Sequence, residues 1–363
     1  MLRLLQTSDV HLGARDVDLG EAAGMLRDRR IAAFERSLAL AASEQVNLVL
    51  VAGDLFDSNL VSRALVERVA AGLGGLAKAG IRAVILPGDH DPLDPSSVWR
   101  AFGLAALAGA PGMVDVLDPA AGAAGDLALA DLGLMITARF PAADLRDDRW
   151  RIGLVHRQAR LRDDEIAGAG VDYLAVGGLH EAASGGAADV AWGASGAPDL
   201  VTTRDRAGEV LLVRLEDLGE RRAVTVERRR VGTTRYDAIS LDLAGYADGA
   251  ALQAAIAARA DGGAGADLLL DVALTGDWAD QLEADPDAIQ AALRDRFLQL
   301  RVRNEASPVL TGAEAPPAET IRGSFIRDLE ARIATPAEGD PPPDELRAAL
   351  RLGRQLLAPR DRT

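Results

Sequence analysis

The stretch Leu2-Arg3-Leu4-Leu5-Gln6-Thr7-Ser8-Asp9-Val10-His11 begins as a short apolar run and ends on a carboxylate and an imidazole. Two later stretches repeat this arrangement: residues 46–52 lead into Gly53-Asp54, and residues 81–86 lead into Pro87-Gly88-Asp89-His90-Asp91. Helical apolar spacing occupies residues 27–45 and 61–76 between them. Short apolar strands that alternate with helices predict an α/β fold with a parallel sheet covered on both faces.

The pattern changes along the chain. Further strand-like runs cover residues 127–138, 151–155 and 172–176, and residues 209–215 and 223–231 form a predicted hairpin. Strands at 236–243, 267–275 and 300–303, with helices near 250–260 and 286–298, make up a small α+β unit. We therefore expect three parts: a domain over 1–231, an α+β domain over 232–305, and a tail over 306–363.

The tail contains Pro-rich breaks at 313–318 and 335–343, with one amphipathic helix between them and another after the second. The first, over 318–333, has apolar residues at helical spacing, and so does the second, over 344–357. One interpretation is that these apolar faces pack on their own domain. The other is that they form a docking platform for a partner protein.

Composition excludes several classes of protein. A chain of 363 residues that is 48% hydrophobic and 26% charged is globular, not disordered. The absence of Cys excludes disulfide scaffolds, thiolate zinc sites and cysteine nucleophiles, and fits a reducing compartment. With no secretory leader and no apolar run long enough for a membrane span, we expect a cytoplasmic protein without a membrane partner. The formal charge of −15 argues against binding nucleic acid by overall charge and suits a site that gathers cations.

All four histidines of the chain follow predicted strands: His11, His90, His156 and His180. Asp9, Asp54 and Asp89 stand at the same ends of their strands. In an open α/β sheet, ligands bind at the carboxyl ends of the strands, so we predict that all seven side chains lie on one rim. A register error of one residue in the later strands would send His156 and His180 to the opposite face.

A mixed set of carboxylates and imidazoles suits manganese, iron or zinc better than the oxygen-only shells of magnesium or calcium. Five or more such ligands exceed what one catalytic metal needs. The natural inference is a two-metal site, whose cations lie roughly 3.5–4 Å apart and activate a hydroxide for attack on a phosphoryl group.

Five motifs in order resemble the signature of the calcineurin-like metallophosphoesterases: Asp9-Val10-His11, Gly53-Asp54, Gly88-Asp89-His90-Asp91, His156 and Gly177-Gly178-Leu179-His180. Within that superfamily the chain resembles the SbcD/YhaO-type DNA repair nuclease subunits. Supporting stretches are Leu12-Gly13, residues 29–36, Ala52-Gly53-Asp54-Leu55-Phe56-Asp57 and residues 192–198. The resemblance covers residues 1 to about 230, and residues 232–305 more weakly as the family's capping domain. It implies a β-sandwich flanked by helices, in α/β/β/α layers, with a helical C-terminal tail.

Carried over by this resemblance, Asp9, His11, Asp54 and His180 hold the first of two divalent metal ions, with Asp54 bridging. Asp89 and His156 belong to the second. His90 is the acid that protonates the leaving oxygen and is not a ligand. Manganese is the expected metal, with iron or zinc as alternatives.

Two departures from the family pattern fall on the side of the second metal. Asp89 replaces the family's Asn, and Gly178 replaces the first His of its final motif. In one reading the anionic Asp89 compensates, with water or Glu181 filling the vacancy. In the other, the site holds only one metal well and turns over slowly or not at all. The presence of His90 favours a retained but altered site. Restoring His at Gly178 together with Asp89→Asn would separate the two readings.

The resemblance implies a metal-dependent phosphodiesterase that acts on DNA ends in double-strand-break repair. Its implied partners are DNA, an SbcC-like coiled-coil ATPase docked on the tail helices, and a second copy of the chain bound through the first domain's helices. The alternative is a catalytically weakened scaffold subunit that binds DNA and the ATPase. A third reading is a phosphatase for a small phosphoester.

Two arginine clusters offer local positive charge. They comprise Arg146, Arg149, Arg151, Arg157, Arg160 and Arg162, and then Arg221, Arg222, Arg228, Arg229, Arg230 and Arg235. Each is either a solvated face interleaved with acidic residues or a phosphate-binding surface.

Overall fold

The computed structural model describes residues 1–15, 20, 22–142, 148–202, 207–219, 221–263, 265–278, 284–308, 316–337, 339–342, 345–346, 349–350, 352–353 and 357. It divides into two compact units, Met1–Arg235 and Tyr236–Thr363. All candidate site residues lie in the first unit.

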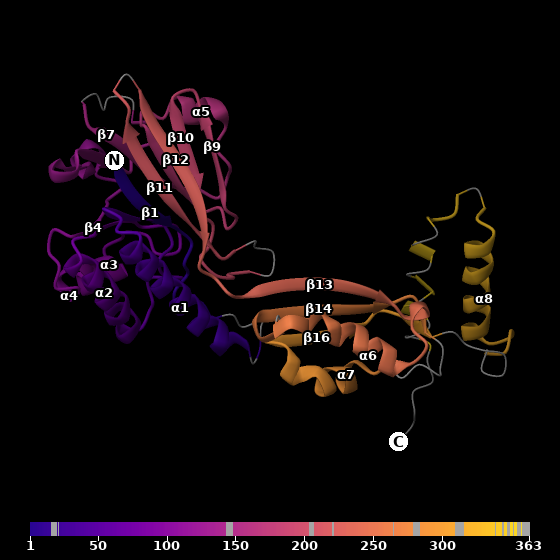
Figure 1. The fold of residues 1–363 in the computed structure, drawn as a ribbon. Helices are drawn as coiled ribbons and strands as arrows, with labels where there is room; N and C mark the ends of the chain where they lie inside the picture. The colour runs from indigo at the N-terminus through magenta and orange to yellow at the C-terminus, as the bar shows by residue number, and fades with distance from the viewer. Residues whose placement is uncertain are drawn as a thin grey trace. The chain divides into compact units, whose positions relative to one another are not determined.

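The first unit contains two six-stranded sheets (Figure 1). The first sheet has the order β12 (Arg222–Arg230), β11 (Glu209–Asp217), β1 (Leu2–Thr7), β2 (Leu48–Ala52), β3 (Arg82–Leu86) and β4 (Val114–Val116). The second has the order β5 (Leu127–Leu129), β6 (Leu134–Thr137), β7 (Trp150–His156), β8 (Tyr173–Gly177), β10 (Val190–Ala194) and β9 (Ala183–Ala187). Strands β1 to β4 are parallel, as are β6, β7, β8 and β10. The hairpin expected at 209–231 is present as antiparallel β11 and β12.

Alternation along the strands explains why the sheets stack. In β2, Leu48 and Leu50 face the second sheet, whereas Val49 and Val51 face the helices. Successive side chains of a strand point to opposite faces, so a continuously apolar strand needs cover on both. In β7, Ile152 and Leu154 likewise join the core between the two sheets.

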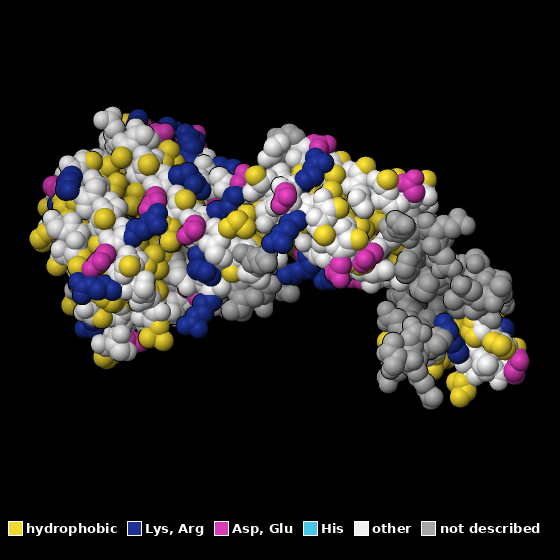
Figure 2. Space-filling view, turned by 90° about the horizontal axis from the view of Figure 1, so that it is seen from below, with side chains coloured by type: hydrophobic (Ala, Val, Ile, Leu, Met, Phe, Trp, Pro, Cys, Tyr) yellow, Lys and Arg dark blue, Asp and Glu magenta, His cyan; other side chains and the backbone are white. Residues whose placement is uncertain are grey.

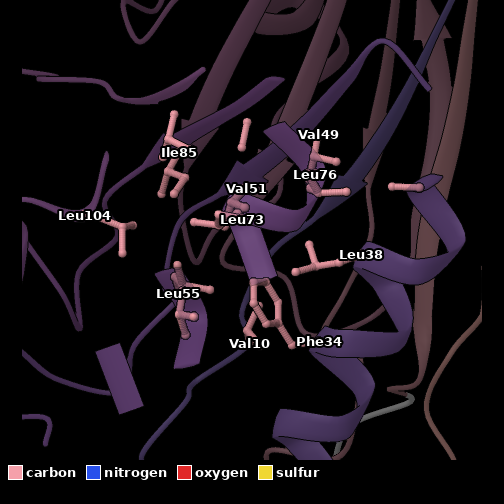
Figure 3. Packing of buried hydrophobic residues seen from close by; sticks show 14 of the residues in the cluster. Val10, Phe34, Leu38, Val49, Val51, Leu55, Leu73, Leu76, Ile85 and Leu104 are labelled. Atoms are coloured by element: carbon pink, nitrogen blue, oxygen red, sulfur yellow. The ribbon is translucent and has the colours of Figure 1, made fainter. Parts of the chain in front are cut away.

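The helices of the first unit are α1 (Ala22–Ser43), α2 (Arg63–Lys78), α3 (Val98–Phe102), α4 (Leu104–Leu107) and α5 (Asp163–Ala167). Phe34 and Leu38 of α1 and Leu73 and Leu76 of α2 pack on the outer face of the first sheet (Figure 3). Ile166 of α5 packs on the outer face of the second. These α/β/β/α layers confirm the fold class implied by the resemblance.

The structure corrects the sequence-based prediction at three places. The single parallel sheet expected from the alternation is two sheets, so one face of each is covered by the other sheet. The run at 127–138 is two antiparallel strands, because Gly133 with φ 62° turns the chain between β5 and β6. The β9–β10 hairpin was not predicted, since its Ser-Gly-Gly sequence has almost no apolar pattern.

The second unit carries a three-stranded sheet of β13 (Arg235–Asp242), β14 (Leu268–Thr275) and β16 (Gln299–Asn304), covered by α6 (Gly249–Ala257) and α7 (Pro286–Leu293) (Figure 1). Strands β15 (Asp277–Trp278) and β17 (Ser307–Pro308) form a small second pair. The α+β pattern predicted for this segment is therefore present. Short 3-10 turns occupy Gly122–Gly125, Ala130–Leu132, Leu243–Gly245, Ala258–Gly263, Gly265–Asp267 and Arg294–Arg296.

The tail helix α8 (Ile321–Ala334) matches the first predicted amphipathic helix. Of the second, expected at 344–357, only residues 345–346, 349–350, 352–353 and 357 lie within the described chain. Phe325, Leu329 and Ile333 of α8 pack against Leu346 and Leu350 in a cluster separate from that of the sheet. These contacts cover described apolar residues of the two segments against each other. A boundary near residue 305, between the α+β domain and the tail, stays a prediction.

Within the described residues, no helix has both the length and the apolar character needed to cross a membrane.

Candidate metal centre

The seven candidate residues come from two sheets. Asp9 and His11 follow β1, Asp54 follows β2, and Asp89 and His90 follow β3, all in the first sheet. His156 ends β7 and His180 follows β8 in the second sheet. The expectation that all seven residues lie on the rim of one sheet is therefore wrong, because they lie on the rims of two sheets. These two rims are adjacent, so the side chains still come together.

A hydrogen-bonded link between the sheets holds the two rims together. Gln6 of β1 is fully buried, and its amide donates to the carbonyls of Val176 and Gly193 at 3.3 and 2.9 Å. The hydroxyl of Tyr173 on β8 donates to the Gln6 side-chain oxygen at 2.5 Å. These three partners of the Gln6 amide all lie on the other sheet.

The first group of donor atoms joins Asp9, His11 and His180, whose ligand atoms lie within 4.8 Å of one another. The His11 and His180 rings are 5.4 Å apart, centroid to centroid. Asp54 Oδ2 lies 3.6 Å from His11 Nε2. Asp9 and His11 are almost fully buried, whereas His180 is partly exposed, so this group extends from the interior to the surface.

The second group centres on His156. Its Nε2 lies 3.1 Å from Asp54 Oδ2 and 2.6 Å from Asp89 Oδ1. Asp9, Asp54 and His156 also offer ligand atoms within 4.8 Å of one another. Asp54 therefore stands between the two groups, the position that a bridging carboxylate requires.

The ring orientations fit metal binding. His11 Nδ1 lies 3.2 Å from the Asp57 carboxylate, and His156 Nδ1 lies 3.0 Å from the Ala52 carbonyl. Both partners accept hydrogen bonds, so each Nδ1 carries the proton and each Nε2 is turned toward the centre, as in metal-ligating histidines. Among the described residues the buried His11 Nε2 has no hydrogen-bond partner. An unpartnered nitrogen facing two carboxylates is a suitable ligand for a divalent cation.

The charges of the cluster shift its pKa values. Burial raises the pKa of Asp9, although the Ser8 hydroxyl and the nearby histidines oppose it. Burial would also raise the pKa of Asp54, but the hydrogen bond and charge of His156 and the His90 backbone N–H outweigh it and hold that pKa below its usual range. Despite burial, the Asp54 carboxylate raises the pKa of His156 to about 9. In the metal-free chain, His156 is therefore positively charged beside these carboxylates at neutral pH.

The loops around the centre have unusual backbone conformations. Asp9, His11 and Asp54 have φ values of 52°, 48° and 50°, a left-handed region that non-glycine residues rarely adopt. Backbone hydrogen bonds stabilise them, with the N–H of Asp9 donating to Gly53 O and that of His11 to Asp54 O. Such strain concentrates at functional sites.

Glycines let the two rims approach. A Cβ at Gly53 would lie 2.0 Å from His156 Nδ1, and one at Gly177 would lie 1.6 Å from the Ala52 carbonyl oxygen. A Cβ at Gly88 would lie 2.1 Å from Asp54 Oδ1. At these three positions any side chain would collide with groups of the centre, so the motifs require glycine there.

Gly178, the departure from the family pattern, has its own structural role. Its φ is +85°, and a Cβ there would lie 2.6 Å from the backbone carbon and oxygen of Arg157. Its N–H donates to both carboxylate oxygens of Asp9, at 3.0 and 3.1 Å. The position provides a backbone donor to the first group and no side-chain ligand to the second.

His90 lies at the edge of the centre with its side chain 47% exposed. Its Nδ1 is 3.1 Å from the Asp57 carbonyl oxygen, and its ring is 4.6 Å from that of His11. Its backbone N–H donates to Asp54 Oδ1 at 2.9 Å. A half-exposed imidazole beside the buried groups can meet a substrate oxygen arriving from solvent.

Two residues of the centre were not singled out by the sequence analysis. Asp57 contacts His11 and His90, and these histidines hold the pKa of its carboxyl below the usual value. Asp91 is buried and accepts hydrogen bonds from the backbone of Gly88 and Phe56, and burial raises its pKa to about 7. Both residues lie in motifs that directly follow predicted strands. That position near the strand ends is the sequence signal by which they could have been identified.

The arginine clusters are largely paired. Arg151 and Arg222 share Asp172, Arg162 contacts Asp164, and Arg229 contacts Glu227. Arg157 and Arg160 lie near Glu165 and Glu181, while Arg146 lies outside the described residues. On the face drawn in Figure 2, basic side chains are interspersed with acidic and hydrophobic ones. These ion pairs favour the interpretation that each arginine cluster is a solvated face interleaved with acidic residues, over a phosphate-binding surface.

Comparisons with known proteins find similar chains among curated sequences and solved structures. Over 91 residues the chain is 35% identical to the DNA double-strand break repair protein Mre11 of Aeropyrum pernix, a match that covers 25% of this chain and 21% of that protein. The chain thus spans about a fifth of that relative's length. Among solved structures, TT1561 of Thermus thermophilus has a TM-score of 0.40 at 13% identity, covering 63% of this chain and 99% of that one. Pseudomonas putida nuclease MPE has a TM-score of 0.24 at 16% identity, covering 41% and 59%. Both scores are too low to carry an argument.

The family model of the calcineurin-like phosphoesterases matches residues 2–178, which include the two candidate residues after β1, Asp54, the Asp89-His90 pair and His156. His180 follows two residues beyond the match. Residues 2–178 therefore form a domain of the calcineurin-like phosphoesterases, a family of metal-dependent phosphoesterases.

Proposed function

We propose that this chain is a metal-dependent phosphodiesterase that cleaves DNA at its ends during double-strand-break repair. The observation that carries the proposal is the convergence of four histidines and three aspartates, from five strand ends on two sheets, on one centre. Asp9, His11, Asp54 and His180 would hold one divalent cation, and Asp54, Asp89 and His156 a second.

Divalent cations bound there would lower the pKa of a water molecule and neutralise the charge that develops on the phosphoryl oxygens. The protein's own part is to orient the ligands. Asp57 and the Ala52 carbonyl hold His11 and His156 in the tautomer that presents Nε2. Gln158 donates to Asp89 Oδ2 at 2.7 Å and leaves Oδ1 turned to His156.

His90 is the proposed general acid. Hydroxide attacks phosphorus in line with the bond that breaks, and the leaving oxygen needs a proton. With Nδ1 of His90 held at the Asp57 carbonyl, its Nε2–H is the proton donor that a substrate oxygen could reach.

DNA as the substrate has weaker support, the short similarity to Mre11. Manganese as the metal, an SbcC-like ATPase docked on the tail, a homodimer, and a cytoplasmic location are further parts of the proposal. The one large apolar side chain of α8 that remains exposed within the described tail helix, Ile321, is 83% exposed and marks where such a partner could contact it.

Gly178 favours a second candidate, a scaffold subunit with weak catalysis. It supplies no side-chain ligand, which leaves three protein ligands for the second cation. Under this reading the centre binds one cation well and contributes mainly DNA and partner contacts.

The test uses metal-stripped protein and bis(p-nitrophenyl) phosphate with added Mn²⁺, Fe²⁺, Co²⁺ or Zn²⁺. We expect manganese-dependent turnover that falls at least about 100-fold in His90→Asn and in His11→Asn. His90→Asn should keep manganese affinity, whereas His11→Asn should lose it, as measured by calorimetry. Linear and circular DNA then separate end-directed cleavage from general phosphodiesterase activity. Metal binding without turnover of any substrate would favour the scaffold subunit.

A further inference from the structure

A large cavity opens beside the second group of ligands. It measures about 790 Å³ and is lined by His156 and Asp89 together with residues of the loops after β3, β6 and β7. Pockets of roughly 300–1,000 Å³ are the size of small-molecule sites, so the cavity exceeds what a phosphate group alone requires. Because two proposed ligands form part of its lining, a group that fills the cavity lies next to the proposed site of the reacting phosphate.

Part of the cavity lining is apolar. It includes Phe140 together with Pro87, Pro119 and Pro141. The guanidinium carbon of Arg157 lies over the Phe140 ring, 5.8 Å from its centroid. Nucleic-acid bases stack on aromatic rings and on arginine guanidinium groups, and a base on this face of Phe140 takes the place of the guanidinium.

The polar part of the lining offers hydrogen bonds. Gln158 uses one amide N–H for Asp89, which leaves its amide oxygen and second N–H for other partners. Arg157 is 43% exposed, and its ion pair with Glu165 is a loose one at 3.5 Å. Both side chains can therefore turn to a ligand that carries donors, acceptors and a negative charge.

We propose that this cavity binds the nucleoside attached to the scissile phosphate, with its base stacked on Phe140 and Arg157 contacting the adjoining phosphate. The proposal rests on the proposed phosphodiesterase function and names the part of the substrate that the centre recognises beyond phosphorus.

The first experiment compares two manganese-dependent substrates with the same leaving group: thymidine 5′-(p-nitrophenyl phosphate) and methyl p-nitrophenyl phosphate. In Phe140→Leu, which keeps an apolar side chain against the core beneath it, the ratio of kcat/KM for the thymidine ester to that for the methyl ester should fall about tenfold. This lower ratio should arise from a higher KM for the thymidine ester. Phe102→Leu replaces another partly buried phenylalanine of the same unit that does not line the cavity, and should leave the ratio unchanged. An unchanged ratio in Phe140→Leu would overturn the proposal.

The second experiment separates this proposal from the proposed function, because it needs no turnover. Thymidine 5′-monophosphate and 2-deoxyribose 5-phosphate are titrated into the protein in a calorimeter. The nucleotide should bind about tenfold more tightly in the native chain, and this advantage should disappear in Phe140→Leu. Equal affinities in the native chain would exclude a base-binding cavity even if the chain hydrolyses phosphodiesters. If both esters resist hydrolysis while the nucleotide keeps its advantage, the cavity stands and the catalytic proposal fails.

Discussion

At the scale of single residues, the centre depends on hydrogen bonds that are made away from the metal-facing atoms. Asp57 and the Ala52 carbonyl each accept from an Nδ1 and thereby aim the Nε2 of His11 and His156 inward. Partners of this kind commonly change metal affinity or activity about 10–100-fold when they are removed.

Asp57→Asn should therefore lower manganese-dependent turnover about 10–100-fold, because the neutral amide holds His11 less firmly and removes the charge 3.9 Å from His90 Nδ1. Steady-state rates on an aryl phosphodiester and calorimetric manganese affinity measure the effect. Glu67→Gln, which changes an exposed carboxylate paired with Arg63 on α2, is the control. Rates within twofold of the native chain in Asp57→Asn would contradict the assigned role.

His156 makes stability depend on pH in the metal-free protein. Its pKa rises from 6.5 to about 9 on folding, so between these values the folded state binds more protons than the unfolded state. The free energy of unfolding should therefore fall as pH rises from about 6.5 to 9, by up to about 3 kcal/mol. Urea unfolding at pH 6 and pH 9 measures the fall, and His156→Gln should remove most of it. Stability that rises with pH over this range would show that His156 is neutral in the folded chain.

Gly178 can be tested against a glycine with similar backbone geometry. Gly178→Ala introduces strain from a positive φ and also places a Cβ 2.6 Å from the Arg157 backbone, whereas Gly80, with φ +77°, has nothing within 4 Å. We expect Gly178→Ala to destabilise the chain by about 1–3 kcal/mol more than Gly80→Ala in urea unfolding. Equal losses would mean that the Arg157 segment moves aside easily. The same collision means that Gly178→His changes the backbone as well as adding a ligand.

At the scale of elements, the centre exists because two sheets end at the same place. Strands β1 to β3 bring the carboxylates, His11 and His90, and β7 and β8 bring the other two histidines. The parallel pairing of His156 with Gly177 sets the height of β7 against β8. The link from Gln6 to Tyr173 ties the first sheet to the second a few residues before the first motif.

Tyr173→Phe tests this link. It removes the hydroxyl that donates to the fully buried Gln6 side chain and leaves that acceptor unpaired, at a cost of about 1–3 kcal/mol. Thermal or urea unfolding should show the loss. Tyr246→Phe, which alters a partly buried tyrosine of the second unit, should change stability by less than about 0.5 kcal/mol. A loss in Tyr173→Phe as small as in this control would mean that the hydrogen bond contributes little to joining the sheets.

At the scale of the whole molecule, the two units have separate interiors. The buried clusters around both large sheets comprise only residues of Met1–Arg235, and the clusters of the second unit lie beyond Tyr236. Every proposed ligand and the cavity lined by Phe140 belong to the first unit.

A chain shortened to residues 1–235 should accordingly fold and hydrolyse a small aryl phosphodiester with a kcat/KM within about threefold of the full chain, since a unit with its own core can fold alone. Its activity on linear DNA should fall further, if residues 236–363 contact a long substrate. A folded fragment that binds no manganese would show that the centre needs the second unit.

Local sequence was enough to identify the main elements and to name the candidate ligands. Apolar runs at β1, β2, β3, β7 and β8 are local signals, and the residues that follow each run mark the strand ends where ligands gather. His11, Asp54, His90 and their companions could be named for the same reason.

The sheet that each strand joins follows from tertiary structure alone, because strand pairing links residues far apart in the chain and leaves no local pattern. Two sheets with one shared interior produce the same apolar strands as a single sheet between helices. The contacts of Asp57, the collision that excludes a side chain at Gly178, and the cavity at Phe140 depend on loops from different strands that meet where the rims of the two sheets come together. Their distances follow from how the two sheets pack, which no segment of the sequence specifies alone.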